Sequence, residues 1–424
     1  MPHEKGFFRN VLKLGGGTAL GQMLVVIATP IITRLYNPHE LGLLGIFMAF
    51  VGFVGVGVGF RYEMSLVSVQ DDREADCLLT SSLLLTVPTS LCAGFILYIM
   101  IRNNLLSYRS LPGWSVIVAV FMLILTGVFT SLRFWCVRHS HFEMISRVLV
   151  SQGLGRAVVP IAYGLAKTDW LGLLLGEMLG RILGIGRMLR MAWPSISKSL
   201  YPFRAGYFAK VMRQNWKSPA ILLPSSMIDA LAAMLPLPVI SFLFGMESAG
   251  QFFLVQRLSS LPAGLIATSV ADVFHPSITK ARWKEPDQVR AILWSVTKKL
   301  AVTSFLIYAA IAIVSPMIFG VVFGRKWIVA GICMAILSPQ LMVAVVISPV
   351  SRLLLVVDRM ELKLIFDLVN LIIPISSLFV MYQWGYDFLV CICAYVFSSI
   401  VANLVYYVLI WHASDVRGTV ENRI

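Results

Sequence analysis

About a dozen apolar stretches, separated by short polar segments, run along the 424 residues of this chain. Roughly 20 apolar residues cross the hydrocarbon core of a bilayer as a helix, and lipid forces each span to satisfy its own backbone hydrogen bonds. The pattern predicts an all-α polytopic membrane protein of about 12 transmembrane helices. We place the spans at 14–33, 41–60, 78–101, 115–135, 148–166, 171–191, 220–244, 249–273, 299–320, 329–350, 362–384 and 387–411.

The composition excludes an ordinary soluble protein. Hydrophobic residues make up 58% of the chain and charged residues 13%. A soluble chain of this kind would expose more apolar surface than water tolerates. The weak alternation typical of an outer-membrane barrel is absent from the sequence, so we expect helical spans in a cytoplasmic (inner) membrane.

Lysine and arginine are unevenly distributed between the two sets of loops. Most of the 35 lie in the termini and the even-numbered loops, and it is cytoplasmic loops that retain such residues. Because an even number of spans puts both termini on one side, we predict that both termini are cytoplasmic. The same bias accounts for the net charge of +14, so we expect no nucleic-acid partner.

The amino terminus and the cysteines carry no sign of processing or of metal binding. The basic segment up to Gly17 precedes a full span without a small-residue cleavage site, so we expect a retained first helix. The six cysteines form no C-x-x-C pair and lie in spans or at predicted cytoplasmic ends. We therefore predict neither disulfides nor a metal site, and no cofactor.

The polar segment 192–219 lies midway along the chain. We interpret it as a cytoplasmic connector between an N-terminal six-helix bundle, 1–191, and a C-terminal six-helix bundle, 220–424. A shift of 208 positions aligns Pro30 with Pro238. Six spans between the copies give both the same direction, so we predict a parallel pseudo-repeat, a plan in which transporters bind substrate between the halves.

Prolines occur inside many spans, where each frees a backbone carbonyl and kinks the helix. Most of them are ordinary for membrane helices. Pro236 and Pro238 are so close together that they should break the seventh span, and we predict a hinge there.

Three runs in the first 80 residues carry a family resemblance. They are Phe8-Arg9-Asn10-Val11-Leu12-Lys13-Leu14, Pro30-Ile31-Ile32-Thr33-Arg34-Leu35-Tyr36-Asn37-Pro38-His39-Glu40-Leu41-Gly42 and Arg61-Tyr62-Glu63. These runs resemble the Wzx-type bacterial polysaccharide (O-antigen) flippases. That polysaccharide transporter family belongs to the superfamily that also holds MurJ-like lipid II flippases and MATE exporters. The second half of the chain carries no matching motif.

The resemblance implies a flippase that moves an undecaprenyl-pyrophosphate-linked oligosaccharide from the cytoplasmic to the periplasmic leaflet by alternating access. Such a protein lies in the bacterial inner membrane and feeds the synthesis of O-antigen lipopolysaccharide, capsule or exopolysaccharide. The implied partners are the lipid-linked oligosaccharide, membrane lipids and other proteins of polysaccharide assembly and export.

Local chemistry gives part of the motif a simpler role. Arg34 and Tyr36 suit the lipid headgroup level, and Asn37-Pro38 makes a turn before the next helix. Arg61 and Glu63 lie at the cytoplasmic end of the second span, and we expect them to be interfacial. They could pair with each other, meet a lipid phosphate, or act as snorkelling anchors.

Among the ionisable residues of the predicted spans, five lie well away from the span ends, where a charge is costly and usually faces a bundle interior or a wet cavity. They are Arg156, Glu177, Arg181, Asp229 and Arg257. Glu177 and Arg181 lie four residues apart and so on one face of a helix. Asp367 is nearer the end of a span, and we expect it to snorkel.

A flippase for a pyrophosphate lipid must offer cations to the headgroup, and arginine binds phosphate oxygens with two parallel hydrogen bonds. We hypothesise that Arg156, Arg181 and Arg257 line a central cationic cavity. Glu177 or Asp229 would balance the charge or carry a coupling H⁺ or Na⁺. The alternative is a structural Glu177–Arg181 pair, with Asp229 as a hydrogen-bonded core residue.

Other functions of polytopic membrane proteins fit less well. A polysaccharide polymerase would be an enzyme with large periplasmic loops, but the longest odd-numbered loop, 102–114, is short and has no catalytic cluster. A MATE-like cation-coupled exporter of drugs or metabolites would need a cavity dominated by carboxylates, whereas arginines prevail here. A lipid II flippase stays open as an alternative, and nothing resembles the selectivity filter of a channel.

Overall fold

In the computed structural model of this protein, helices are the regular elements of the residues that the structure describes, 2–201, 205–284, 288–357 and 359–414. This confirms the predicted all-α class. The chain folds as two compact units, Met1–Gly250 and Gln251–Ile424. The predicted halves, 1–191 and 220–424 with their connector 192–219, rest on the pseudo-repeat and stay a prediction.

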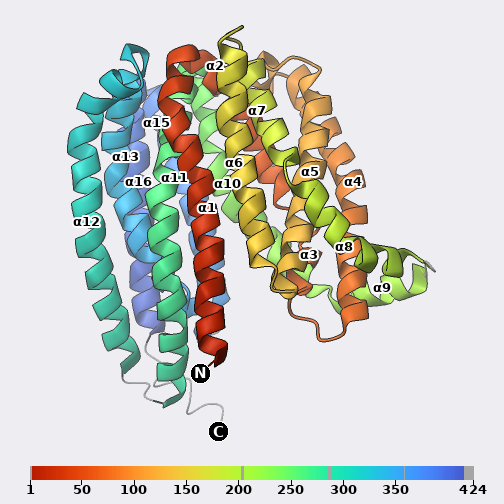
Figure 1. Ribbon diagram of the computed structural model, residues 1–424. Helices are drawn as coiled ribbons and strands as arrows, with labels where there is room; N and C mark the ends of the chain where they lie inside the picture. Colours follow the sequence, from red (N-terminus) through yellow and green to blue (C-terminus); the bar gives the residue numbers. More distant parts are fainter. Residues whose placement is uncertain (1, 202–204, 285–287, 358, 415–424) are drawn as a thin grey trace. The chain divides into compact units, whose positions relative to one another are not determined.

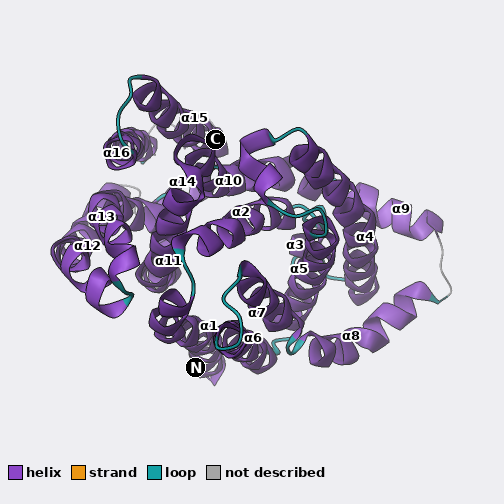
Figure 2. Cartoon of the chain, turned by 90° about the horizontal axis from the view of Figure 1, so that it is seen from above, coloured by secondary structure: helices purple, strands orange, loops and turns teal. Residues whose placement is uncertain are grey.

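The first unit contains most of the helices (Figure 1). They are α1 (Pro2–Leu35), α2 (Pro38–Gly55), α3 (Tyr62–Ser65), α4 (Asp72–Arg102), η1 (Leu105–Ser110), α5 (Ser115–Arg138), α6 (Phe142–Gly164), α7 (Trp170–Ile182), α8 (Ile185–Leu200), α9 (Ala205–Gln214), η2 (Ser218–Leu222), α10 (Leu223–Met234) and the start of α11 (Pro236–Lys284). Helix α1 runs along α6, and α6 packs against α7. Figure 2 shows α9 beside α4.

The second unit continues from α11. Its further elements are α12 (Gln288–Val322), η3 (Arg325–Trp327), α13 (Ile328–Val350), α14 (Leu353–Val356), α15 (Met360–Gln383) and α16 (Phe388–Ala413). Helix α12 packs along α13, and α15 packs along α16, as Figures 1 and 2 both show. Helix α13 also contacts α16, so the two pairs form one bundle.

Within the described residues, 9 segments are long and apolar enough to cross a membrane. The predicted first four and last four spans each overlap one of them. The seventh and eighth fall together in Ser218–Ser259, and the fifth and sixth match none. The fifth corresponds to α6, which carries several charges, and the sixth to α7, which has only 13 residues. The protein is a multi-pass membrane protein.

The single sixth span predicted at 171–191 is wrong, because the structure divides it into α7 and α8. The break lies at Gly184, whose φ of 86° is in the left-handed region that favours glycine. Helix α8 then presents one apolar stripe to α4 and α5, and its polar face lies outward. The buried residues of the stripe are Ile185, Met188, Ala192 and Ile196.

The seventh and eighth spans are separated where the sequence predicts a turn. Gly245 has φ 83° and ψ 173°, a conformation essentially restricted to glycine, and it divides α11 into two helical stretches. The predicted hinge at Pro236 and Pro238 lies at the junction of α10 and α11. Leu235 between those helices keeps helical angles of −64° and −32°, so bending at this point stays a prediction.

The turn between the first two spans lies where the sequence places it. Helix α1 ends at Leu35, α2 begins at Pro38, and the backbone N–H of Asn37 donates to the Glu40 carboxylate. Tyr36 differs from the expected headgroup anchor because it is fully buried. Its hydroxyl donates to the carbonyl of Pro160 at 2.8 Å, and burial raises the pKa of this phenol to about 12.

Candidate functional site

Close contact between α6 and α7 creates the polar part of the site. Helix α7 carries glycine at every fourth position, at 172, 176 and 180. A Cβ on Gly180 would lie 2.7 Å from Cγ of Arg156, and a Cβ on Gly155 would lie 2.8 Å from Cα of Gly180. Small residues therefore let the two backbones approach, as in many membrane helix pairs. The approach brings Glu177 of α7 to Arg156 of α6.

Arg156 and Glu177 form an ion pair. The Arg156 Nε lies 3.2 Å from the Glu177 Oε2, and their side chains are 30% and 12% exposed. This partner could not be predicted from the sequence, because the two residues lie on different helices. The alternative role predicted for Glu177 was a pair with Arg181 on the same helix, whereas the structure gives it a partner on the neighbouring helix.

Arg181 completes a small cationic patch, which we define as Arg156, Glu177 and Arg181. The Nη1 of Arg181 donates to the hydroxyl of Thr126 on α5 at 2.8 Å. Its Nε is buried and has no hydrogen-bond partner within the described part of the chain. The charge of Arg181 acts on both Arg156 and Glu177. Two guanidinium groups and one carboxylate leave the patch with an excess of positive charge.

The other predicted site residues belong to other parts of the sequence than α6 and α7. Asp229 is exposed on α10, and Arg257 is half-buried on α11 in the second unit. Arg34 is exposed at the end of α1, as an interfacial anchor would be. Arg61 lies 4.0 Å from Glu63, but Glu63 is only 2% exposed, so it differs from the interfacial residue that we expected. That Arg257 lines one cavity with Arg156 and Arg181 stays a prediction.

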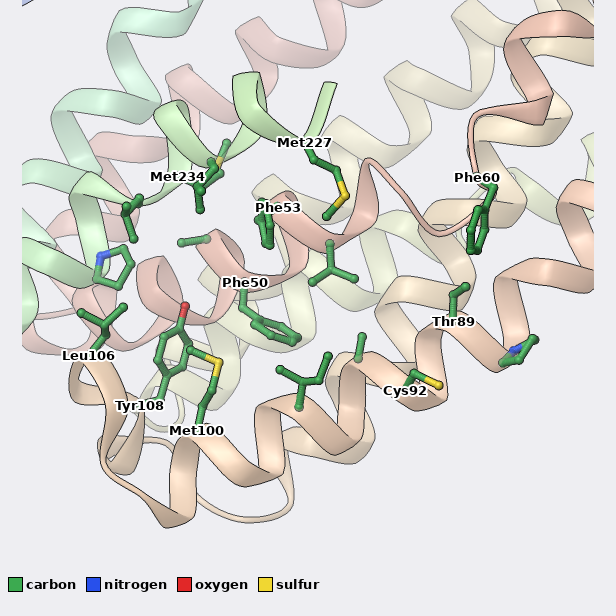
Figure 3. A pocket seen from close by; sticks show the side chains of 18 of the residues that line it. Phe50, Phe53, Phe60, Thr89, Cys92, Met100, Leu106, Tyr108, Met227 and Met234 are labelled. Carbon is green, nitrogen blue, oxygen red and sulfur yellow. The ribbon is translucent and has the colours of Figure 1, made fainter. Parts of the chain in front are cut away.

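An apolar pocket of about 680 Å³ lies within the first unit, between α2, α4, η1 and α10. Figure 3 shows Phe50 and Phe53 of α2, Met100 of α4, and Met227 and Met234 of α10 around it. Flexible methionine side chains adapt to irregular apolar ligands. Sequence reasoning missed this pocket, because each lining residue alone reads as an ordinary apolar residue of a span.

The chemistry of these two features is complementary. Guanidinium groups bind phosphate oxygens strongly, and an apolar pocket of this size can hold a hydrocarbon chain. Among the described residues, no group of three or more His, Cys, Asp and Glu side chains could hold a metal ion. The cationic patch is therefore suited to binding an anionic group, and the apolar pocket to binding a hydrocarbon chain.

Fold and site together define a class of membrane protein. The chain is similar to a MATE family transporter of the MOP superfamily, solved in an inward-facing conformation, with a TM-score of 0.74 and 15% identity over 94% of this chain and 96% of that one. A MOP superfamily transporter from Pyrococcus furiosus, described as having a binding pocket of reverse polarity, gives a TM-score of 0.62 at 15% identity, with 96% of each chain covered. The protein thus has the MATE-like fold of that superfamily.

The sequence identifies the family within that fold. The pattern of the family described as polysaccharide biosynthesis protein matches residues 31–332, and the chain belongs to this family. It is also 22% identical over 268 residues to the teichuronic acid biosynthesis protein TuaB of Bacillus subtilis. That match covers 63% of this chain and 54% of the relative, so the chain spans about half the length of TuaB.

Proposed function

We propose that this protein is a flippase for lipid-linked oligosaccharides. It moves an undecaprenyl-pyrophosphate-linked repeat unit of O-antigen, capsule or exopolysaccharide from the cytoplasmic to the periplasmic leaflet. Alternating access, coupled to H⁺ or Na⁺, drives the movement. Membership of a polysaccharide biosynthesis family and a MATE-like fold support this proposal. So do the three runs near the amino terminus that resemble Wzx-type flippases.

The observation that carries the proposal is the cationic patch. A pyrophosphate headgroup needs cations inside the protein while it crosses the hydrocarbon core. Arg156 and Arg181 supply two guanidinium groups on two helices that pack together, and the buried Nε of Arg181 has no hydrogen-bond partner among the described residues. Glu177 limits the surplus charge through its 3.2 Å pair with Arg156, so that the patch can release the headgroup again.

The apolar pocket supports the part of the proposal that concerns the lipid chain of the substrate. Its lining residues come from helices α2, α4 and α10, which belong to candidate membrane spans. The one hydroxyl among the lining side chains of α4, that of Thr89, donates to backbone carbonyls, including that of Val58 at 2.8 Å. An isoprenoid chain in such a pocket would therefore leave the Thr89 hydroxyl paired.

Reconstitution of the purified protein tests the proposal. Liposomes carrying undecaprenyl-pyrophosphate-linked oligosaccharide are treated with a membrane-impermeant glycosidase, which cleaves only outward-facing sugars. We expect the protein to bring nearly all of the lipid-linked sugar within reach of the enzyme. Protein-free liposomes should stop at about half. Equal protection with and without the protein would contradict the proposal.

Two rival transport functions are separated in the same system. A lipid II flippase would expose lipid II, and not the oligosaccharide lipid, to an impermeant probe. A MATE-like exporter would move a cationic dye against its gradient. The excess of arginine in the cationic patch disfavours cationic substrates, because like charges repel at short range. A polysaccharide polymerase would lengthen the sugar chain, which mass analysis of the recovered lipid would reveal.

A further inference from the structure

Two carboxylates are buried among the described residues, Glu63 at 2% and Asp367 at 5% exposure. Their surroundings differ. Asp367 lies 2.5 Å from the ammonium group of Lys363, one helical turn away, so its charge is neutralised at close range. This corrects the expectation that Asp367 snorkels. Glu63 has no such close cation, because the nearest Nη of Arg61 lies 4.0 Å from its Oε1.

The side-chain hydrogen-bond partner of Glu63 is a neutral hydroxyl group, that of Ser82. The Ser82 hydroxyl donates to the Glu63 Oε2 over 3.4 Å, and the hydroxyls of Ser82 and Ser131 lie 2.7 Å apart. Both serines are at most 1% exposed. The backbone closes the cluster on another side, since a Cβ on Gly59 would lie 2.7 Å from the Glu63 Oε2. A buried carboxylate whose cation lies 4.0 Å away and whose side-chain hydrogen bond is long is poorly compensated when it is ionised.

The backbone just before Glu63 is strained. Phe60 and Arg61 have φ values of 53° and 60°, and such left-handed conformations are uncommon for side chains of this size. Strain of this kind persists where the surroundings hold it, and it clusters at functional sites. The strained turn leads directly into α3, which carries Glu63.

We propose that Glu63 is a proton-binding carboxyl group and that Arg61 is the cation released when the proton binds. A proton from water adds to a carboxylate oxygen of Glu63, and the resulting O–H can donate to the hydroxyl of Ser82. The 4.0 Å attraction to Arg61 is then lost, and the guanidinium becomes available to an anionic group. The proton site itself does not depend on the proposed function. Its consequence, a proton-linked transport cycle, deepens the proposed function and rests on it.

The electrostatic surroundings agree with proton binding. Glu63 lies in the connection between two membrane spans, and burial raises its pKa above the ordinary value of 4.5, against the opposing effects of a backbone hydrogen bond, Arg61 and Ser82. The elements packed against α3 are α4, α5 and η2. On α5, Arg138 is engaged elsewhere, by the carbonyl of Leu66 and by Asp72 at 2.7 Å. Arg61 is the charged side chain that acts on Glu63.

Infrared spectroscopy of the purified protein tests the site without any substrate. The wild-type protein should show the C=O band of a protonated carboxyl that titrates with pH, and Glu63→Gln should lack that band. Asp367→Asn is the matched control and should keep it. A titrating band that persists in Glu63→Gln would overturn the proposal. If Glu63→Gln does not fold, Ser82→Ala should shift the titration to higher pH, and an unchanged titration would overturn it equally.

Stability gives a second readout with a definite sign. A carboxyl whose pKa is raised by folding holds its proton more tightly in the folded state, so stability is lost as pH rises through the folded-state pKa. Thermal unfolding in detergent should show this loss for the wild type and a flatter pH profile for Glu63→Gln. Identical profiles would overturn the proposal.

The transport assay separates this proposal from the proposed function. The protonated fraction of a single site changes by about tenfold per pH unit beyond its pKa, and the flipping rate of the wild type should follow it. Glu63→Gln should flip at a rate nearly independent of pH. If the infrared band titrates as expected but no lipid-linked oligosaccharide moves, the proposed function fails and the proton site stands. A variant that flips with the full wild-type pH dependence overturns the proton site alone.

Discussion

Arg156 of α6 and Glu177 of α7 lie 3.2 Å apart, and this ion pair joins the two helices that sequence reasoning had treated as separate sources of charge. Desolvating two such groups costs free energy that a pair of apolar side chains would not. Helix packing alone does not require the pair, because glycines already hold α6 and α7 in close contact. A role in binding an anionic ligand would explain why these two charged residues are present.

Replacement of Arg156 tests that role. We expect Arg156→Ala to lower the rate of lipid-linked oligosaccharide flipping by about 10-fold to 100-fold, because a charge-assisted hydrogen bond contributes about 1.5–3 kcal/mol. Arg147→Ala is the matched control on the same helix. Arg147 is 66% exposed and pairs with Glu143 one turn away, so its loss should change the rate by less than about twofold. Equal losses in both variants would contradict a specific role for Arg156.

A double-mutant cycle measures the coupling between Arg156 and Glu177. With side chains 30% and 12% exposed, the pair is partly screened, and we expect a coupling free energy of about 1 kcal/mol in unfolding experiments in detergent. The pair of Lys167 and Asp169 is the control. Lys167 is 69% exposed, so solvent should screen the pair and the coupling there should be smaller. A coupling at Arg156 no larger than that of the control would show that the pair does not stabilise the contact between α6 and α7.

Substitution by alanine should affect stability differently at a glycine in the contact between α6 and α7 and at a glycine outside it. Gly180→Ala places a Cβ 2.7 Å from Cγ of Arg156 and 3.0 Å from the carbonyl oxygen of Gln152, so it should destabilise the protein by about 1–3 kcal/mol. Gly186 on α8 has no atom within 4 Å of the position that its Cβ would occupy. Gly186→Ala should therefore be neutral or stabilise the helix by up to about 1 kcal/mol. Thermal unfolding in detergent measures both, and a neutral Gly180→Ala would refute the steric argument.

The predicted orientation can be read by cysteine labelling. Thr168 and Lys210 are exposed, in the loop before α7 and on α9. In a chain whose exposed Cys92 and Cys393 have been replaced, an impermeant maleimide added outside the cell should label Thr168→Cys. It should label Lys210→Cys only after the membrane is opened. The reverse pattern would place both termini outside the cytoplasm. It would refute the orientation predicted from the distribution of lysine and arginine between the loops.

Local features of the sequence were sufficient for much of the fold. Long apolar runs predict helices because each span must satisfy its own hydrogen bonds in lipid, and the turn at Asn37-Pro38 follows from local chemistry. The division of the sixth predicted span escaped this reasoning. Gly184 lies within a run that remains apolar, so hydropathy could not reveal a left-handed turn there.

The site depended on contacts that no local pattern encodes. The sequence singled out Arg156, Glu177 and Arg181 because charges inside spans are rare, but it could not say which helix would face which. Glycine at every fourth position of α7 was a usable signal for close packing that we did not exploit. Glu63 was expected at an interface because it follows a span, and only the folding of α3 against α4 and α5 explains its burial.

The shortness of α7 sets a condition on the lipid around it. Its 13 residues, at about 1.5 Å each, reach roughly 20 Å, whereas the hydrocarbon layer is about 30 Å thick. The carbonyl groups left without helical partners at its carboxyl end must then be hydrated or be served by neighbouring side chains.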